Sequence, residues 1–236
     1  MRYQGRIGAL GLALVAMLLF SASAAGAASA AEFKANPAFP VNFTGSGKVG
    51  LLETKAGRSV TCTETKVANG AVVNAKEATA TVVFDGCFAE HLPLLTCQSG
   101  SVSGQIVANV KATPIDLNAA HTEAGLLLEP ASGTQFVSFH CALGPVNEEL
   151  IVTGSIIGKV PTAQLNEFRS TLTLEFKATL GSQEYTQVEG AGARHVLMTE
   201  GKGTEPFAAE ESGISEAVPG TTTLTAEEGQ KVELVP

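Results

Sequence analysis

The residues of this chain with the clearest capacity for chemistry are its four cysteines, Cys62, Cys87, Cys97 and Cys141. A cysteine can act as a nucleophile, bind zinc or oxidise to a disulfide, depending on its neighbours and its compartment. A zinc site built from Cys87, His91 and Cys97 would separate its ligands by three and nine residues, and neither spacing matches the usual ligand pairs. We therefore predict two disulfides in an exported chain.

Strand parity selects among the three pairings that four cysteines allow. Cys62 and Cys141 each alternate in step with the apolar residues of their strands, so both side chains should face a core. Cys87 and Cys97 flank a short loop, which they could close locally. The prediction is a long closure, Cys62–Cys141, and a short one, Cys87–Cys97. The loop from Phe88 to Thr96 is then the first place to look for a functional surface.

Other catalytic candidates are weak. Residues 100–104 have the glycines of a G-x-S-x-G motif, but Val102 stands where the nucleophile would be. No H-E-x-x-H motif or phosphate-binding glycine loop occurs. The four histidines are scattered without a partner at ligand or catalytic spacing: His91, His121, His140 and His195. The prediction leans against an enzyme, with no catalytic residue, metal or cofactor.

Glutamates leave one enzymatic alternative open. Doublets such as Glu148-Glu149 and Glu210-Glu211 are poor acid/base pairs, because adjacent residues of a strand point to opposite faces. Two glutamates from distant strands could still meet in a cleft at the roughly 5–10 Å that glycoside hydrolysis needs. A secreted hydrolase is therefore the runner-up hypothesis.

The elements that must position these residues have the pattern of β-strands. A period of two marks residues 59–66, 101–112 and 169–180. The continuous run Leu126-Leu127-Leu128 predicts a strand buried on both faces, forming a hairpin with residues 135–141. The dipeptides Asn69-Gly70 and Gly181-Ser182 predict turns, and residues 161–168 have room for one helical turn.

About a dozen short strands with turn residues between them predict an all-β, antiparallel fold. We favour a β-sandwich, with barrel-like closure as the alternative, and little helix. Residues 31–236 are expected to form a single β-rich domain with an acidic C-terminal region from about residue 200.

Residues 1–30 have the pattern of a signal peptide. Arg2 and Arg6 precede an uncharged, mainly apolar run at residues 7–20, and an alanine-rich stretch follows. Ala28-Ser29-Ala30 is the preferred A-x-A site, so cleavage is expected after Ala30. No later run is long and apolar enough to span a membrane. We expect a protein that is secreted, either extracellular or associated with the cell envelope, and not inserted in the membrane after cleavage.

Charge and aromatic content narrow the partners. Without Arg2 and Arg6 the chain keeps 13 of its 15 basic residues against 23 acidic ones, a formal charge of −10. Such a surface repels phosphate backbones, which argues against nucleic acid. Beyond residue 30 the chain has no tryptophan and one tyrosine, Tyr185, so a conventional carbohydrate-binding platform is disfavoured. A cell-envelope component or protein partner stays open.

A resemblance supports this interpretation. Four features of the chain look like those of a group of exported, uncharacterised four-cysteine proteins of high-GC bacteria. They are the F-D-G-C strand end at residues 84–87, Cys97 before residues 100–106, the F-x-x-F-x-C strand at residues 136–141, and V-T-G-S-I-I-G at residues 152–158. The likeness implies export and a β-rich fold, and no activity. The leading hypothesis is a non-catalytic binding or structural module. An assembly subunit that pairs by strand addition through its C-terminus is a further alternative.

Overall fold

The computed structural model describes residues 30–90, 95–216 and 221–236, and nearly every element in them is a β-strand. One short 3-10 turn, η1 (Thr162–Gln164), is the only helical element in these residues, and it lies where the sequence left room for one. The all-β prediction is confirmed. The main sheets close on themselves as two eight-stranded antiparallel barrels, so the closed form of the predicted fold is the one observed.

The first barrel has the strand order β10 (Ala124–Pro130), β13 (Ile156–Val160), β14 (Thr171–Glu175), β19 (Thr221–Ala226), β2 (Val41–Gly47), β5 (Glu64–Asn74), β6 (Glu77–Asp85) and β9 (Ile106–Asp116). The second barrel has the order β11 (Gln135–Leu143), β12 (Val146–Gly154), β17 (Leu197–Gly203), β18 (Phe207–Glu216), β3 (Gly50–Thr54), β4 (Ser59–Cys62), β7 (Phe88–Ala89) and β8 (Leu95–Gln98).

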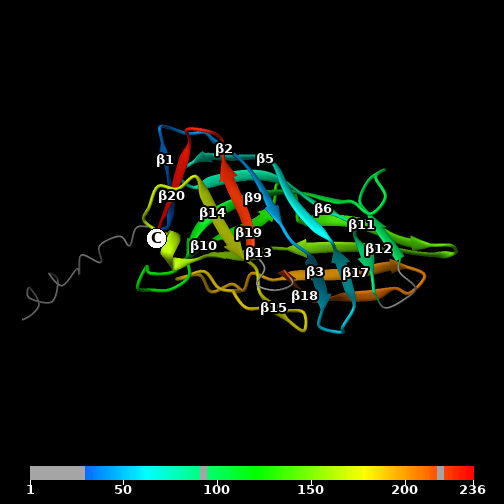
Figure 1. The fold of residues 1–236 in the computed structure, drawn as a ribbon. Coiled ribbons are helices and arrows are strands. Elements are labelled where there is room, and N and C mark those ends of the chain that lie inside the picture. The colour runs from blue at the N-terminus through cyan, green and yellow to red at the C-terminus, as the bar shows by residue number, and fades with distance from the viewer. Residues whose placement is uncertain (1–29, 91–94, 217–220) are drawn as a thin grey trace, which may run out of the picture.

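The two orders correspond strand by strand. At each place, the strand of the first barrel and that of the second are consecutive main-sheet strands of the chain: β10 and β11, β13 and β12, β14 and β17, β19 and β18, β2 and β3, β5 and β4, β6 and β7, and β9 and β8. The barrels therefore share one circular order along an elongated molecule, with β10, β14 and β19 toward one end and β11, β12 and β17 toward the other (Figure 1).

Alternation of apolar and polar residues explains the strands. In β14, Leu172 and Leu174 are buried while the threonines beside them are more exposed. In β9, Ile106, Ala108 and Val110 are buried on one side. The period of two predicted for residues 101–112 and 169–180 is thus the inward–outward alternation of barrel strands.

Glycine allows the chain to turn from one barrel into the other. Gly154 ends β12 with a φ of +97°, and a Cβ at this position would collide with the carbonyl oxygen of Val196. Only glycine adopts this conformation without strain while allowing the backbones to approach so closely. Gly158 in β13 likewise lies against the ring of Phe176, which a Cβ would approach to 2.8 Å.

The segment between β14 and β17 covers the outside of the first barrel. It contains a small hairpin, β15 (Ala178–Thr179) and β16 (Ser182–Gln183), and its Tyr185 and Val188 pack on Leu127 and Ile157. This explains why β10 is buried on both faces, as its three leucines predicted. The hairpin turn predicted at Gly181-Ser182 is present one residue earlier, at Leu180-Gly181, where both φ angles are positive.

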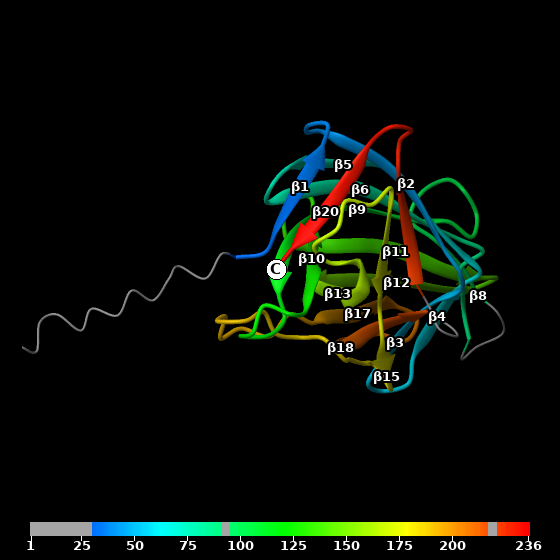
Figure 2. The ribbon, with the colours of Figure 1, turned by 60° about the vertical axis from the view of Figure 1, so that its left-hand side comes forward.

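A separate two-stranded sheet caps the first barrel. It consists of β1 (Glu32–Asn36) paired antiparallel with β20 (Lys231–Val235), and we call it the cap. The two strands lie side by side in both ribbon views (Figures 1 and 2). Val232 exchanges two backbone hydrogen bonds of 2.9 Å with Arg169, which fixes β20 to the segment before β14.

Three local predictions are wrong. Asn69-Gly70 is a bulge inside β5 rather than a turn, with Asn69 at a φ of +50° and Gly70 against the ring of Phe43. Residues 59–66 form two strands, β4 and β5, separated at Thr63. Finally, β10 and β11 form no hairpin, because each pairs with other strands in a different barrel.

Candidate binding cavity

The four cysteines form one row across the wall of the second barrel, and the predicted pairing is wrong. Disulfides join Cys62 to Cys87 and Cys97 to Cys141, each with a Cα–Cα distance of 4.0 Å. Cys62, Cys97 and Cys141 lie in β4, β8 and β11, and Cys87 directly precedes β7. These four strands are successive neighbours in the sheet. All four side chains are buried, so the inward parity predicted for Cys62 and Cys141 is correct.

Sheet geometry explains the correction. Cys62 and Cys141 are separated by β7 and β8, which is about 14 Å at three strand spacings, whereas a disulfide spans at most about 7 Å between Cα atoms. Cys87 and Cys97 are neighbours, but the Cys97 amide donates to the Cys87 carbonyl at 2.9 Å. In an antiparallel sheet, hydrogen-bonded residue pairs have their Cα atoms farther apart than non-hydrogen-bonded pairs. The two disulfides, with Cα atoms 4.0 Å apart, have the closer spacing of non-hydrogen-bonded pairs.

The alternative zinc site has no thiolate ligands, because Cys87 and Cys97 each form a disulfide. Its third residue, His91, lies outside the described residues, as do residues 92–94 of the loop from Phe88 to Thr96 in which we expected a functional surface. Within residues 30–90, 95–216 and 221–236, no three His, Cys, Asp or Glu side chains gather closely enough to hold a metal ion.

The main candidate site is a cavity inside the first barrel that no sequence motif indicated. It has a volume of about 100 Å³ and is almost entirely apolar. Strands all around the barrel contribute to it, and Phe33 of the cap closes it. Its lining includes Val82, Phe84 and Leu224, which point inward and yet stay partly exposed. Protein interiors are normally packed as densely as organic crystals, so an interior with this much free space needs an explanation.

Small side chains in the barrel wall produce this space. Ala78 and Ala80 alternate inward along β6, and Ala112 of neighbouring β9 lies directly opposite Ala78. Larger residues at these places would fill an eight-stranded barrel, whose interior is just wide enough for side chains or one small ligand. The signal in the sequence is alanine at inward positions of otherwise Val- and Thr-rich strands, and it becomes informative only once the barrel is known.

The cavity lining includes a few polar side chains and, among the described residues, no charged one. Its polar lining residues are Thr65, Thr79, Ser170 and Thr222, and no described lining residue is ionisable. A buried charge without a partner would be costly here. The ligand that this lining suits is therefore uncharged and largely hydrocarbon.

A smaller pocket in the second barrel brings two glutamates together. Glu148 and Glu205 both line a space of about 40 Å³, beside Arg58 and Phe207. The backbone amide of Glu205 donates to one carboxylate oxygen of the buried Glu148. With about 40 Å³ of free space, this pocket is less than half the size of the first-barrel cavity. It does not hold a sugar ring, and the glutamates therefore give little support to the hydrolase hypothesis.

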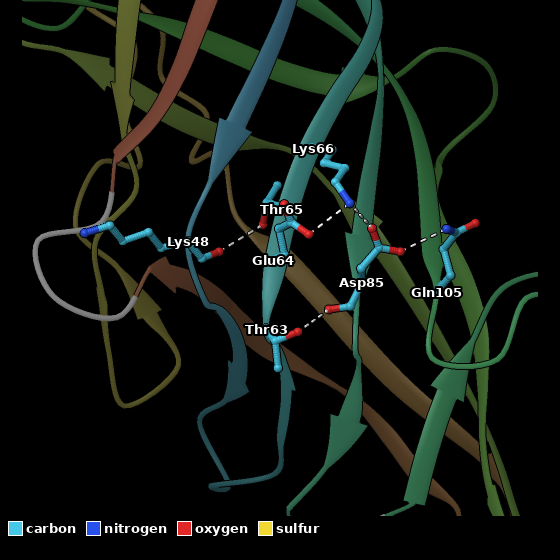
Figure 3. A network of polar contacts seen from close by, with 7 residues as sticks. All are labelled: Lys48, Thr63, Glu64, Thr65, Lys66, Asp85 and Gln105. Carbon is cyan, nitrogen blue, oxygen red and sulfur yellow. Dashed lines mark hydrogen bonds and ion pairs between the residues drawn. The ribbon is translucent and has the colours of Figure 1, made fainter.

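A surface network braces the junction between the barrels (Figure 3). The Asp85 carboxylate accepts hydrogen bonds from Gln105 at 2.9 Å and Lys66 at 3.0 Å. Its backbone carbonyl accepts from the Thr63 hydroxyl at 3.2 Å. The hydrogen bond from Gln105 and then the one from Lys66 hold the pKa of Asp85 below its ordinary value of 3.8. The network ties the end of β6 to the break between β4 and β5.

This pKa gives a pH-dependence. Folding lowers the Asp85 pKa, so the ionised Asp85 carboxylate stabilises the folded protein. This contribution is full above the ordinary pKa of 3.8 and is lost as the pH falls through the lowered pKa. We expect Asp85→Asn to cost about 1 kcal/mol at pH 7, after allowance for solvent screening, and less at pH 2. Urea unfolding at both pH values measures this. Glu77→Gln, at an exposed position of the same strand, is the control, and an equal Asp85→Asn cost at both pH values would contradict it.

Comparisons with known proteins add no identification: no protein-family model, curated protein or solved structure matches this chain. In the part of the chain that the structure describes, no helix is long and apolar enough to cross a membrane. The two disulfides are typical of an oxidising environment outside the cytoplasm.

Proposed function

We propose that this protein is an exported, non-catalytic binding protein that holds a small uncharged hydrocarbon ligand inside its first barrel. The observation that carries the proposal is the apolar cavity of about 100 Å³ lined by partly accessible side chains. A dry cavity of about 150 Å³ lined by Leu, Ile and Phe is large enough to bind benzene or xenon. The cavity of this protein has about two thirds of that volume, so it suits a small hydrocarbon no larger than benzene, or the end of an aliphatic chain.

The entry that we propose for the ligand is the seam of the first barrel with the fewest paired residues. Strands β13 and β14 are joined by a single register pair, Lys159 with Glu175, whereas β14 and β19 share five. Phe176 follows this seam, lines the cavity and is partly exposed. Movement of its ring would widen the route without breaking a long hydrogen-bond ladder.

The strand-addition alternative has less support. The C-terminal strand β20 is already paired with β1 along five register positions. Both main sheets are closed in the described residues, so they offer no unpaired edge there. Strand addition needs an exposed edge or a strand to donate.

Methyl NMR with xenon and with benzene tests the proposal. We expect shifts confined to cavity-lining methyl groups such as those of Val82, Leu128 and Leu224, and saturable binding. Ala80→Leu should weaken binding at least about tenfold, since its added atoms would occupy the space of the ligand. Val83→Leu on the outer face of the same strand, opposite Lys66, is the matched control. The proposal fails if no lining methyl responds, or if both variants weaken binding equally.

A further inference from the structure

Asp116 is a buried carboxylate with too few partners. It ends β9, is 7% exposed, and is one of two aspartates in the chain. Its Oδ2 accepts a hydrogen bond of 3.2 Å from the backbone amide of Ala31. His121 Nδ1 lies 3.1 Å from the same oxygen without forming a hydrogen bond, and Oδ1 has no partner among the described residues. Buried polar atoms are nearly always satisfied, so this one calls for an explanation.

The donor residue gives that explanation. Ala31 is buried, 1% exposed, while Ala30 is exposed. The sequence places the preferred signal-peptide cleavage site between these two residues. The residue that would become the N-terminus is therefore the first one buried against the barrel, and its nitrogen already lies on a carboxylate.

We propose that cleavage of the Ala30–Ala31 bond places the new α-ammonium group of Ala31 on Asp116, in a buried ion pair that fixes the cap. The step is a hydrolysis by an endopeptidase of the class that removes export signals. The C–N bond breaks, water supplies the hydroxyl that makes the Ala30 carbonyl a carboxylate, and the Ala31 nitrogen gains protons. One amide N–H becomes three charged donors, and Oδ1 gains a donor within reach.

The charged side chains near Asp116 are compatible with an α-ammonium group at Ala31. Lys76 donates to the carbonyl oxygens of Ala30 at 2.7 Å and Ala31 at 3.0 Å, and it lies 3.9 Å from Glu32. After cleavage it keeps the Ala31 carbonyl and Glu32. His121 is the other basic group beside Asp116. The ammonium group can use Oδ1, so it need not displace His121 from its place beside Oδ2.

The cap connects this ion pair to the cavity. Ala31 is followed directly by β1, and Phe33, two residues along, lines the cavity. The amide of Phe33 also donates to the Ala75 carbonyl at 2.8 Å. An ion pair at Ala31 therefore anchors the start of the strand whose phenylalanine closes the first barrel.

The first test is to identify the N-terminus of the exported protein by intact mass and N-terminal sequencing of the full chain expressed with its leader. We expect residues 31–236. A different N-terminus, or an uncleaved chain, would overturn the proposal. Neither measurement involves a ligand, so the result is independent of whether the cavity binds a hydrocarbon.

The second test compares a form beginning at Ala31 with one beginning at Ala28, whose nitrogen at Ala31 stays an amide. We expect the form beginning at Ala31 to melt roughly 5–10 °C higher, since it gains a buried ion pair. Asp116→Asn should abolish this difference. The control Asp85→Asn should lower both melting temperatures and preserve it. A difference that survives Asp116→Asn, or is absent from the start, would contradict the ion pair.

Two further readouts separate an ion pair from a general effect of length. The difference should be full near pH 7 and decline above about pH 7.7 as the α-ammonium group loses its proton, whereas His121, Lys76 and Glu32 are common to both forms. If the Asp116→Asn variant fails to fold, the chemical reactivity of the α-amine in the unsubstituted forms is measured instead. The α-amine of Ala31 should resist acylation at pH 7 while that of Ala28 reacts, and equal reactivity would refute the proposal.

Discussion

Replacing Cys97 and Cys141 together with alanine should lower the free energy of unfolding by about 4 kcal/mol. The disulfide closes a loop of 44 residues, and chain entropy in the unfolded state gives this magnitude for such a loop. The matching double variant at Cys62 and Cys87 should lose slightly less, about 3.5 kcal/mol, because that loop has 25 residues. Denaturant unfolding of the oxidised proteins measures both losses.

The pairing itself is checked by peptide mapping without reduction. Trypsin alone leaves Cys87 and Cys97 on one peptide, residues 77–111, so a glutamyl endopeptidase that cuts after Glu90 must be added. We expect residues 59–64 joined to 78–90, and residues 91–111 joined to 124–148, since the bond between Glu129 and Pro130 is not cut. A peptide linking Cys62 to Cys141, or Cys87 to Cys97, would contradict the observed arrangement.

Phe33→Ala should be the most damaging single substitution in the cap, with a loss of roughly 3–5 kcal/mol. Phe33 is 2% exposed, and its removal both exposes apolar surface and enlarges the cavity that it closes. The matched control is Phe168→Ala, since Phe168 is 38% exposed and should cost within about 0.5 kcal/mol. Denaturant unfolding compares the two.

The stability of the Phe33→Ala variant should also depend on added hydrocarbon ligands. An enlarged cavity should accept hydrocarbons larger than benzene, and such a ligand should recover part of the lost stability through binding to the folded state. Equal losses for Phe33→Ala and Phe168→Ala would show that Phe33 does not close the barrel. A large loss without any recovery by hydrocarbons would count against the cavity as a ligand site.

Local patterns predicted the strands well and their connections poorly. The alternation that buries Leu172 and Leu174 depends on each residue and its neighbours, so it is readable from the sequence. The Asn69-Gly70 dipeptide has turn propensity, but the pairing of β5 on both sides converts it into a bulge. Such outcomes depend on strands distant in sequence, which local propensity does not encode.

The cysteines and the cavity show the same limit at the candidate sites. Parity correctly put Cys62 and Cys141 on the inner face, but parity says nothing about how many strands separate two residues. The cavity is still harder to predict, since it is the space that Ala78, Ala80 and Ala112 leave empty. An empty volume has no motif, and it exists only after the eight strands of the first barrel close around it.

The strand-by-strand correspondence of the two barrels has a consequence for how the molecule can be divided. The chain passes between the barrels at every one of the matched places, from β2 into β3 first and from β18 to β19 last. Neither barrel is a continuous stretch of sequence, so no truncation can isolate one of them. Tension or damage in one barrel is transmitted along eight covalent links to the other. We expect the disulfides of the second barrel to stabilise the first barrel and its cavity as well.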